Sequence, residues 1–256
     1  MSKHYKLVFY SRIFLFLAAF TGVYLEITRH GGFGMLLYYT VLSNLLVTIF
    51  TLYLLKVMSR VGENWQRPSL LRLKGGVTMS IMITCVIYHF LLAPIATNFY
   101  TLENFLCHYI VPIWFLADTL FFDKQGQYKI WDPAVWTILP FLYMMFALFN
   151  GLVLKLNIPN AKDNPFPYFF LNVNKGWNVV FKWCLIIFVA YMVAGFIFYF
   201  IKQIKRKSSL YSSKISSNHV GFHLQPQNTF EQPAVSLLVC SLIFIEYEIQ
   251  GIHFRI

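Results

Sequence analysis

The sequence predicts an all-α fold: a polytopic membrane protein built as a six-transmembrane-helix bundle with both termini cytoplasmic. The first observation behind this prediction is composition, because 58% of the 256 residues are hydrophobic and only 12% are charged. That apolar share is well above the share in an ordinary soluble domain. The second is the presence of six apolar stretches long enough to cross a hydrocarbon core about 30 Å thick, which takes about 20 helical residues. The third is the placement of basic residues in alternate loops.

The six stretches follow one another along residues 7–26, 35–55, 77–96, 105–122, 134–154 and 179–201. The first has an apolar part too long for a signal peptide, and no small-x-small cleavage pattern follows it, so we expect it to be retained as a span. Residues 1–206 are therefore expected to form the bundle. Residues 207–256 are rich in Ser, Asn and Gln and predict a polar, disordered C-terminal tail with one short apolar segment.

Charge placement predicts the orientation. The formal net charge is +11, but the basic residues lie in loops and tails rather than on one face with interleaved aromatic residues, so we expect no nucleic-acid partner. They concentrate at the N-terminus, at 56–74, at 124–129 and after residue 201. By the positive-inside rule these segments and both termini are cytoplasmic.

Cysteine spacing and motif content argue against a bound metal or cofactor. The cysteines are widely spaced and form no CxxC pair, so they predict neither a zinc site nor a disulfide framework. They are Cys85, Cys107, Cys184 and Cys240. The chain also lacks GxGxxG, Walker and HExxH motifs, so we expect no cofactor and no metal.

Two polar residues inside apolar spans, Thr40 and His108, are the candidate catalytic pair. Thr40 lies about five residues inside the second span, roughly 8 Å deep at 1.5 Å per residue, and His108 lies near the start of the fourth. In the predicted topology both are close to the outer surface. Thr40 also begins a polar stripe at helical spacing on the second span, which should face the bundle interior. The stripe is Thr40, Ser43, Asn44, Thr48 and Thr51.

Such a pair permits nucleophilic hydrolysis. A threonine hydroxyl is a weak nucleophile unless an adjacent base, such as an imidazole with a pKa near neutrality, accepts its proton. Ser43 and Asn44, one turn further along, would orient a water molecule or hydrogen-bond an oxyanion. The alternative is structural, because Ser, Thr and Asn on one helix face commonly join membrane helices.

Other polar groups in the spans are candidate substrate-binding or supporting residues. His89, Tyr143 and Asn150 fall in the outer halves of the third and fifth spans, and Asp118 is near mid-membrane. A lone carboxylate at that depth should be protonated or paired. The connection at 155–177 is aromatic, which predicts either an interfacial belt or a lid over the outer mouth.

Four segments within about residues 5–200 occur in a distinctive order and spacing: YYTVLSNLLV, HYIVPIWFLADTLFF, ILPFLYMMFALFNG and PYFFLNVNKGW. In these segments the sequence resembles a bacterial six-span membrane family often called Pr-six-Pr, itself distantly similar to the animal ADTRP-like, androgen-induced threonine hydrolases. The resemblance implies a six-helix bundle in the bacterial cytoplasmic membrane. It also implies, by position, Thr40 as nucleophile and His108 as base in the cleavage of fatty acid esters of hydroxy fatty acids. The tail after residue 207 departs from the family pattern.

We therefore expect an intramembrane threonine esterase that acts on a membrane lipid or acylated substrate. The alternatives are a non-enzymatic transporter or small-molecule binding protein that uses the same polar cavity, and a membrane scaffold whose polar stripes join helices. Paired helix interruptions in corresponding halves would favour transport, and Pro94, Pro112 and Pro140 do not form that symmetry.

Overall fold

The computed structural model describes residues 2–96 and 99–218, and among these residues there are helices and connections but no strand. The chain divides into two units, Met1–Tyr211 and Ser212–Ile256, and the first holds the helices discussed below. Most of the tail expected at 207–256, including its apolar segment, falls outside the described residues.

Six helical segments of the described chain are long and apolar enough to cross a membrane, which confirms the all-helical, six-span expectation; the orientation of the termini stays a prediction. The main helices are α1 (Lys3–His30), α2 (Tyr39–Val61), α3 (Pro68–Ile87), α5 (Val111–Phe122), α7 (Ile138–Phe149) and α8 (Trp177–Asn218). Between them lie η1 (Gly32–Leu37), η2 (Gly62–Trp65), η3 (Tyr88–Leu92), η4 (Ala93–Ile95), α4 (Leu102–Phe105), η5 (Leu106–Ile110), α6 (Asp132–Trp136), η6 (Asn150–Leu154), η7 (Phe169–Leu171) and η8 (Val173–Lys175).

Two boundaries differ from the hydropathy estimate. The third span begins at Pro68, nine residues before the expected start at 77. A proline suits the first helical turn. Lys74 is acceptable inside the bundle because it pairs with Asp118 there, rather than being exposed in a loop. Helix α8 continues past residue 206 to Asn218, in a stretch with no proline or glycine to end it.

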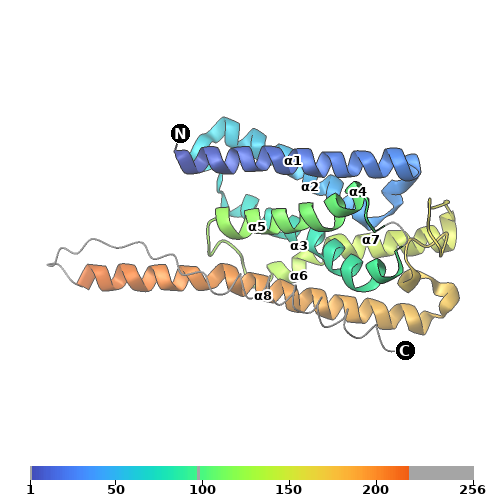
Figure 1. Ribbon diagram of the computed structural model, residues 1–256. Coiled ribbons are helices and arrows are strands. Elements are labelled where there is room, and N and C mark those ends of the chain that lie inside the picture. The colour runs from blue at the N-terminus through green and yellow to red at the C-terminus, as the bar shows by residue number, and fades with distance from the viewer. Residues whose placement is uncertain (1, 97–98, 219–256) are drawn as a thin grey trace, which may run out of the picture. The chain divides into compact units, whose positions relative to one another are not determined.

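The core lies among the first four long helices. Helix α1 packs on α2 and α5, and α3 packs between α2 and α5 (Figure 1). Leu15, Val47, Leu71 and Phe115 belong to the hydrophobic cluster of this group and are almost fully buried. Helix α8 joins through a second cluster in which Tyr191 and Phe198 pack with Trp136 of α6.

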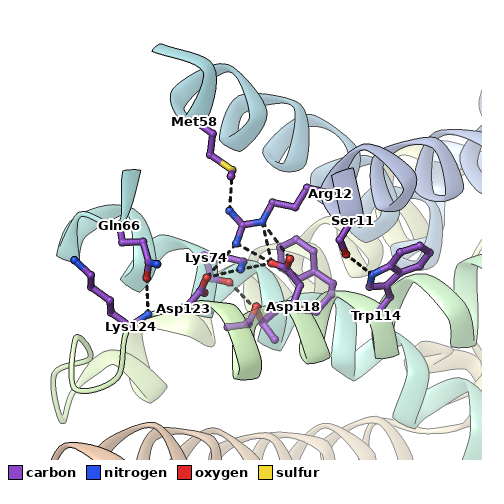
Figure 2. Close-up of polar contacts among 12 residues, drawn as sticks. Ser11, Arg12, Met58, Gln66, Lys74, Trp114, Asp118, Asp123 and Lys124 are labelled. Atoms are coloured by element: carbon purple, nitrogen blue, oxygen red, sulfur yellow. Dashed lines mark hydrogen bonds and ion pairs between the residues drawn. The ribbon is translucent and has the colours of Figure 1, made fainter. Parts of the chain in front are cut away.

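A buried ion cluster ties α1, α3 and α5 together. Arg12 donates to Asp118 from Nε and Nη2, at 3.1 and 3.0 Å, and Lys74 donates to both Asp118 and Asp123 (Figure 2). All four side chains are at most 1% exposed. Lys202 of α8 adds a cation that donates to the main-chain oxygen of Asp123. Because isolated buried charges are strongly unfavourable, the two cations and two carboxylates depend on one another.

In the part of the chain that the structure describes, three π-helical turns interrupt the regular helices. They are η3 at the end of α3, η5 immediately before α5, and η6 at the end of α7. Successive spans run in opposite directions, so α1, α3 and α7 end at the same end of the bundle at which α2 and α5 begin. All three π turns lie at this end. Single π turns inside α-helices occur frequently at functional sites, because the extra residue redirects side chains. Here one of them carries His108.

Candidate functional site

Thr40 occupies the second position of α2. The preceding Tyr38 is extended, with φ −89° and ψ 137°, and makes no side-chain cap, so the first turn of α2 leaves main-chain amides to be satisfied by other groups. The Thr40 side chain points into the bundle and is 9% exposed. The polar stripe that begins at Thr40 is buried along its length, as its helical spacing predicted.

His108 comes to Thr40 from the π turn η5. The imidazole Nε2 lies 3.3 Å from Thr40 Oγ1, although the two residues are 68 positions apart. His108 is 7% exposed, so the pair is shielded from bulk solvent. The sequence predicted this contact, and the structure has it at hydrogen-bonding distance.

The other ring nitrogen fixes the tautomer of His108. Its Nδ1 lies 3.1 Å from the main-chain oxygen of Asn104. A carbonyl oxygen can only accept, so Nδ1 must carry the proton and Nε2 presents a lone pair to the Thr40 hydroxyl. The Tyr88 ring stacks on the imidazole with centroids 3.6 Å apart and holds its plane. This is the state in which an imidazole accepts a proton from a nucleophile.

Ser43 and Asn44 hold the helix rather than face the Thr40 hydroxyl. The Ser43 hydroxyl donates to the Thr40 main-chain oxygen at 3.1 Å and contacts the Thr84 hydroxyl on α3 at 2.8 Å. The Asn44 amide donates to the main-chain oxygens of Thr40 and Cys107, at 2.8 and 3.0 Å. Both therefore join α2 to its neighbours, as polar groups in membrane bundles do, and fix the backbone on which Thr40 stands.

Thr40 opens onto an apolar cavity of about 390 Å³. Its walls come from α2, α3, α7, α8 and the connection at 155–176. Met144, Cys184 and Phe188 are among the apolar side chains, and the hydroxyls of Thr40 and Thr84 supply polar atoms to the lining. A cavity with this lining fits an acyl chain whose polar end lies at Thr40.

A second cavity of about 310 Å³ lies between α2, α3 and α7. It shares Tyr39 and Tyr143 with the first, and these two rings meet edge to face with centroids 4.9 Å apart. Ser43 and Ser80 line it. The two tyrosines therefore form a wall common to both cavities.

The connection at 155–176 folds over this end of the bundle and reaches the site. Tyr168, Phe170 and Leu171 line the larger cavity, which favours the lid interpretation for these residues, whereas Trp177 is 48% exposed. Phe166 lies so close to Gly151 that a Cβ there would be 2.0 Å from its ring.

Tyr143 and Asn150 support the connection and the start of α2. The Tyr143 hydroxyl donates to the Leu37 main-chain oxygen at 2.8 Å, just before α2. Asn150 donates to the main-chain oxygen of Pro165 at 2.9 Å, and its own side-chain oxygen accepts the amide of Leu156. Tyr143 therefore lines the site directly, and Asn150 acts on the connection.

Two of the sequence-predicted site residues lie away from Thr40. His89 contacts the Tyr109 hydroxyl at 3.3 Å and does not line the larger cavity. Asp118 is ten residues beyond His108, roughly 15 Å along the helix, in the ion cluster with Arg12 and Lys74. The described residues contain no group of three or more metal-ligating side chains.

Sequence reasoning did not single out Tyr88 or Arg12 and treated Tyr168 only as part of an aromatic group. An arginine inside an apolar span was the available signal for Arg12. No local pattern distinguishes Tyr88 or Tyr168 from the many other aromatic residues. Comparison of the chain with protein families, characterised proteins and solved structures gives no match.

Proposed function

We propose that the protein is an intramembrane threonine hydrolase that cleaves acyl esters, with Thr40 as nucleophile and His108 as general base. One observation carries the proposal: Thr40 Oγ1, His108 Nε2 and, behind Nδ1, the Asn104 main-chain oxygen form a continuous hydrogen-bonding chain. This chain ends at an apolar cavity of about 390 Å³. A histidine with the tautomer required of a base, next to a hydroxyl in an acyl-sized cavity, fits nucleophilic ester cleavage.

In the first half of the reaction, His108 Nε2 removes the Thr40 hydroxyl proton while Oγ1 attacks the ester carbonyl carbon. The tetrahedral intermediate collapses, the bond to the alcohol oxygen breaks, and the proton on Nε2 passes to the leaving alkoxide. The product is an acyl ester of Thr40 and a free alcohol. The imidazolium formed in between is stabilised by the Asn104 carbonyl that accepts from Nδ1.

In the second half, His108 removes a proton from a water molecule that attacks the acyl-threonine. The intermediate releases Thr40, which regains its proton, and a carboxylic acid leaves. The sum is ester plus water to acid plus alcohol, so no metal or redox group enters the balance. The apolar cavity between α3, α7 and α8 would hold the acyl chain, and the substrate would be a membrane lipid or acylated molecule entering from the bilayer.

The direct test is covalent labelling. The purified protein is treated with an alkyl fluorophosphonate, and the labelled peptide is identified by mass spectrometry. We expect the phosphonyl group on Thr40 and no labelling of Thr40→Ala. Labelling that persists in Thr40→Ala, or wild-type protein that reacts with neither the fluorophosphonate nor a lipid ester, contradicts the proposal.

The second cavity supports a competing function, that of a non-catalytic binding or transport protein for an apolar ligand. Such a protein would bind lipid in both cavities, of about 390 and 310 Å³, without consuming it. Ester recovered intact after prolonged incubation, with affinity unchanged by Thr40→Ala, would favour this function. Appearance of free acid that depends on Thr40 excludes it.

A further inference from the structure

The tetrahedral intermediate of the proposed reaction carries a negative oxygen, and the residues placed so far leave it without a hydrogen-bond donor. His108 already holds the proton it took, with Nδ1 committed to Asn104. Ser43 and Asn44 donate to main-chain oxygens instead. Hydrolases that form such an intermediate place one or more donors about 3 Å from the oxygen, and loss of one typically lowers turnover by about 10²- to 10³-fold.

Tyr168 brings a phenol to this position from the connection outside the spans. Its oxygen accepts the Tyr39 main-chain amide at 3.1 Å and also faces the amide and the hydroxyl of Thr40. It therefore completes the first turn of α2, at the positive end of the helix dipole. Tyr168 also lines the larger cavity together with Thr40, so its oxygen lies where the carbonyl of a bound ester would be attacked.

The proton of the Tyr168 phenol can be donated there. The phenol oxygen accepts the Tyr39 main-chain N–H, which uses a lone pair rather than the hydrogen. The other polar neighbours of the phenol include the hydroxyls of Thr40 and Tyr143, and an oxyanion is a stronger acceptor than either neutral hydroxyl. The neighbouring Tyr143 differs, because its hydroxyl donates to the Leu37 main-chain oxygen at 2.8 Å. Burial raises the pKa of Tyr168 and outweighs the contacts with Thr40, Tyr39 and Tyr143 that lower it, so the phenol remains protonated at neutral pH.

The connection holds Tyr168 firmly, as a preorganised donor requires. Its ring stacks on Phe170 with centroids 5.1 Å apart and meets Tyr38 edge to face at 6.0 Å. Elsewhere in the connection, Phe166 packs against Gly151, and Asp163 forms an ion pair with Lys175. Donors fixed in place before the reaction need no reorganisation as charge develops, and this makes them effective.

We propose that Tyr168 is a catalytic residue whose phenol donates a hydrogen bond to the oxyanion that forms when Thr40 attacks an acyl ester. This assignment rests on the proposed hydrolase function and adds to it a donor supplied from outside the membrane-spanning helices.

The test compares Tyr168→Phe with a matched variant, Tyr38→Phe. The Tyr38 hydroxyl donates to the Pro159 main-chain oxygen at 2.7 Å, so its loss also removes one phenol and one tether of the same connection but leaves the donor at Thr40. The probes are p-nitrophenyl octanoate for turnover and octyl phenyl ether, which has no carbonyl, for binding.

We expect Tyr168→Phe to lower kcat by about 10²- to 10³-fold with little change in KM or in the affinity for the ether. Tyr38→Phe should stay within a few-fold of wild type in kcat. Wild-type kcat in Tyr168→Phe overturns the assignment. So does an equal fall in both variants accompanied by loss of ether binding, because that pattern marks a structural role.

A further measurement covers the case in which Tyr168→Phe does not fold. Incorporation of 3-fluorotyrosine at position 168 keeps the shape of the side chain and strengthens the donor, so kcat should rise with KM unchanged, and an unchanged kcat overturns the assignment. Failure of the hydrolase function itself is distinguishable, because wild-type protein would then show no turnover that depends on Thr40. That result overturns both proposals.

Discussion

Thr40 Oγ1 lies 3.3 Å from His108 Nε2, and the opposite nitrogen of the same ring is held by a main-chain oxygen only four residues earlier in the chain. The His108 ring is therefore oriented by its own helical segment and not by a carboxylate from elsewhere. Asn104 contributes through its backbone, so no side-chain substitution at 104 removes the acceptor.

Substrate chain length should depend on Cys184, which lines the larger cavity from α8. A tryptophan there fills space that a long acyl chain needs, so Cys184→Trp should lower hydrolysis of p-nitrophenyl palmitate much more than hydrolysis of the butyrate. Val189 is on the same helix, is 51% exposed and does not line the cavity, so Val189→Trp is the control. Equal loss for both chain lengths in Cys184→Trp would place the acyl chain elsewhere.

We expect the buried ion cluster to contribute strongly to the free energy of unfolding. Asp118→Asn removes the carboxylate that Arg12 and Lys74 share and leaves two buried cations with Asp123 alone. Breaking a buried pair in this way costs about 3–5 kcal/mol, so thermal unfolding in detergent should occur at a clearly lower temperature. Arg29→Gln is the comparison: Arg29 is 57% exposed in its pair with Glu103, and its loss should cost less than about 1 kcal/mol. Similar midpoints for the two variants would contradict this interpretation.

The membrane topology can be tested with a reporter fusion. Lys56 and Arg60 are exposed near the end of α2, and Arg67 is exposed just before α3. The segment at 97–104 contains no basic residue, so the positive-inside rule places the end of α2 in the cytoplasm. A reporter fused after Lys207 should then be cytoplasmic and the Thr40 site should lie toward the outer leaflet. An external reporter would move the site to the inner leaflet.

Hydropathy and helical spacing predicted the features that depend on single segments. The six spans follow from apolar length, and the burial of Thr40, Ser43 and Asn44 follows from their shared helix face. Features that depend on distant pairs could not be derived in the same way. Lys74 was assigned to a loop because its partner Asp118 is 44 residues away, and the pairing alone makes a lysine acceptable inside α3.

The same difference between single segments and distant pairs decides which parts of the candidate site could be predicted. The approach of Thr40 and His108 followed from a common depth in the membrane, since both spans begin on one side. The position of Tyr168 follows from the path of an irregular connection, which no periodicity encodes. The π turn that redirects His108 is likewise a local departure from the regular helix that the periodic pattern assumes.

Acid should loosen the 155–176 connection through Asp163. Burial would raise the pKa of Asp163, but hydrogen bonds from Lys175 and Asn172 outweigh it and lower the pKa. Because the pKa is lower when folded, its stabilising effect is complete above the ordinary value of about 3.9 and is lost as the pH falls through the folded value. Hydrogen-exchange protection of this connection, corrected for the intrinsic exchange rate at each pH, should therefore fall below about pH 4. Asp163→Asn should show the faster exchange at neutral pH already, and a wild-type profile in that variant would contradict the assignment.

The most direct measurement of the central claim is hydrolysis of p-nitrophenyl octanoate by purified Thr40→Ser, Thr40→Val and His108→Gln. Ser keeps a hydroxyl and should retain some turnover, whereas Val, nearly the same shape, should abolish turnover with little loss of folded protein. His108→Gln should match Val, because it stays polar but cannot act as a base near neutral pH. Thr48→Val, in the same buried stripe but bonded to the Asn44 main-chain oxygen, should remain active. Comparable hydrolysis by wild type, Thr40→Val and His108→Gln would contradict the threonine hydrolase account.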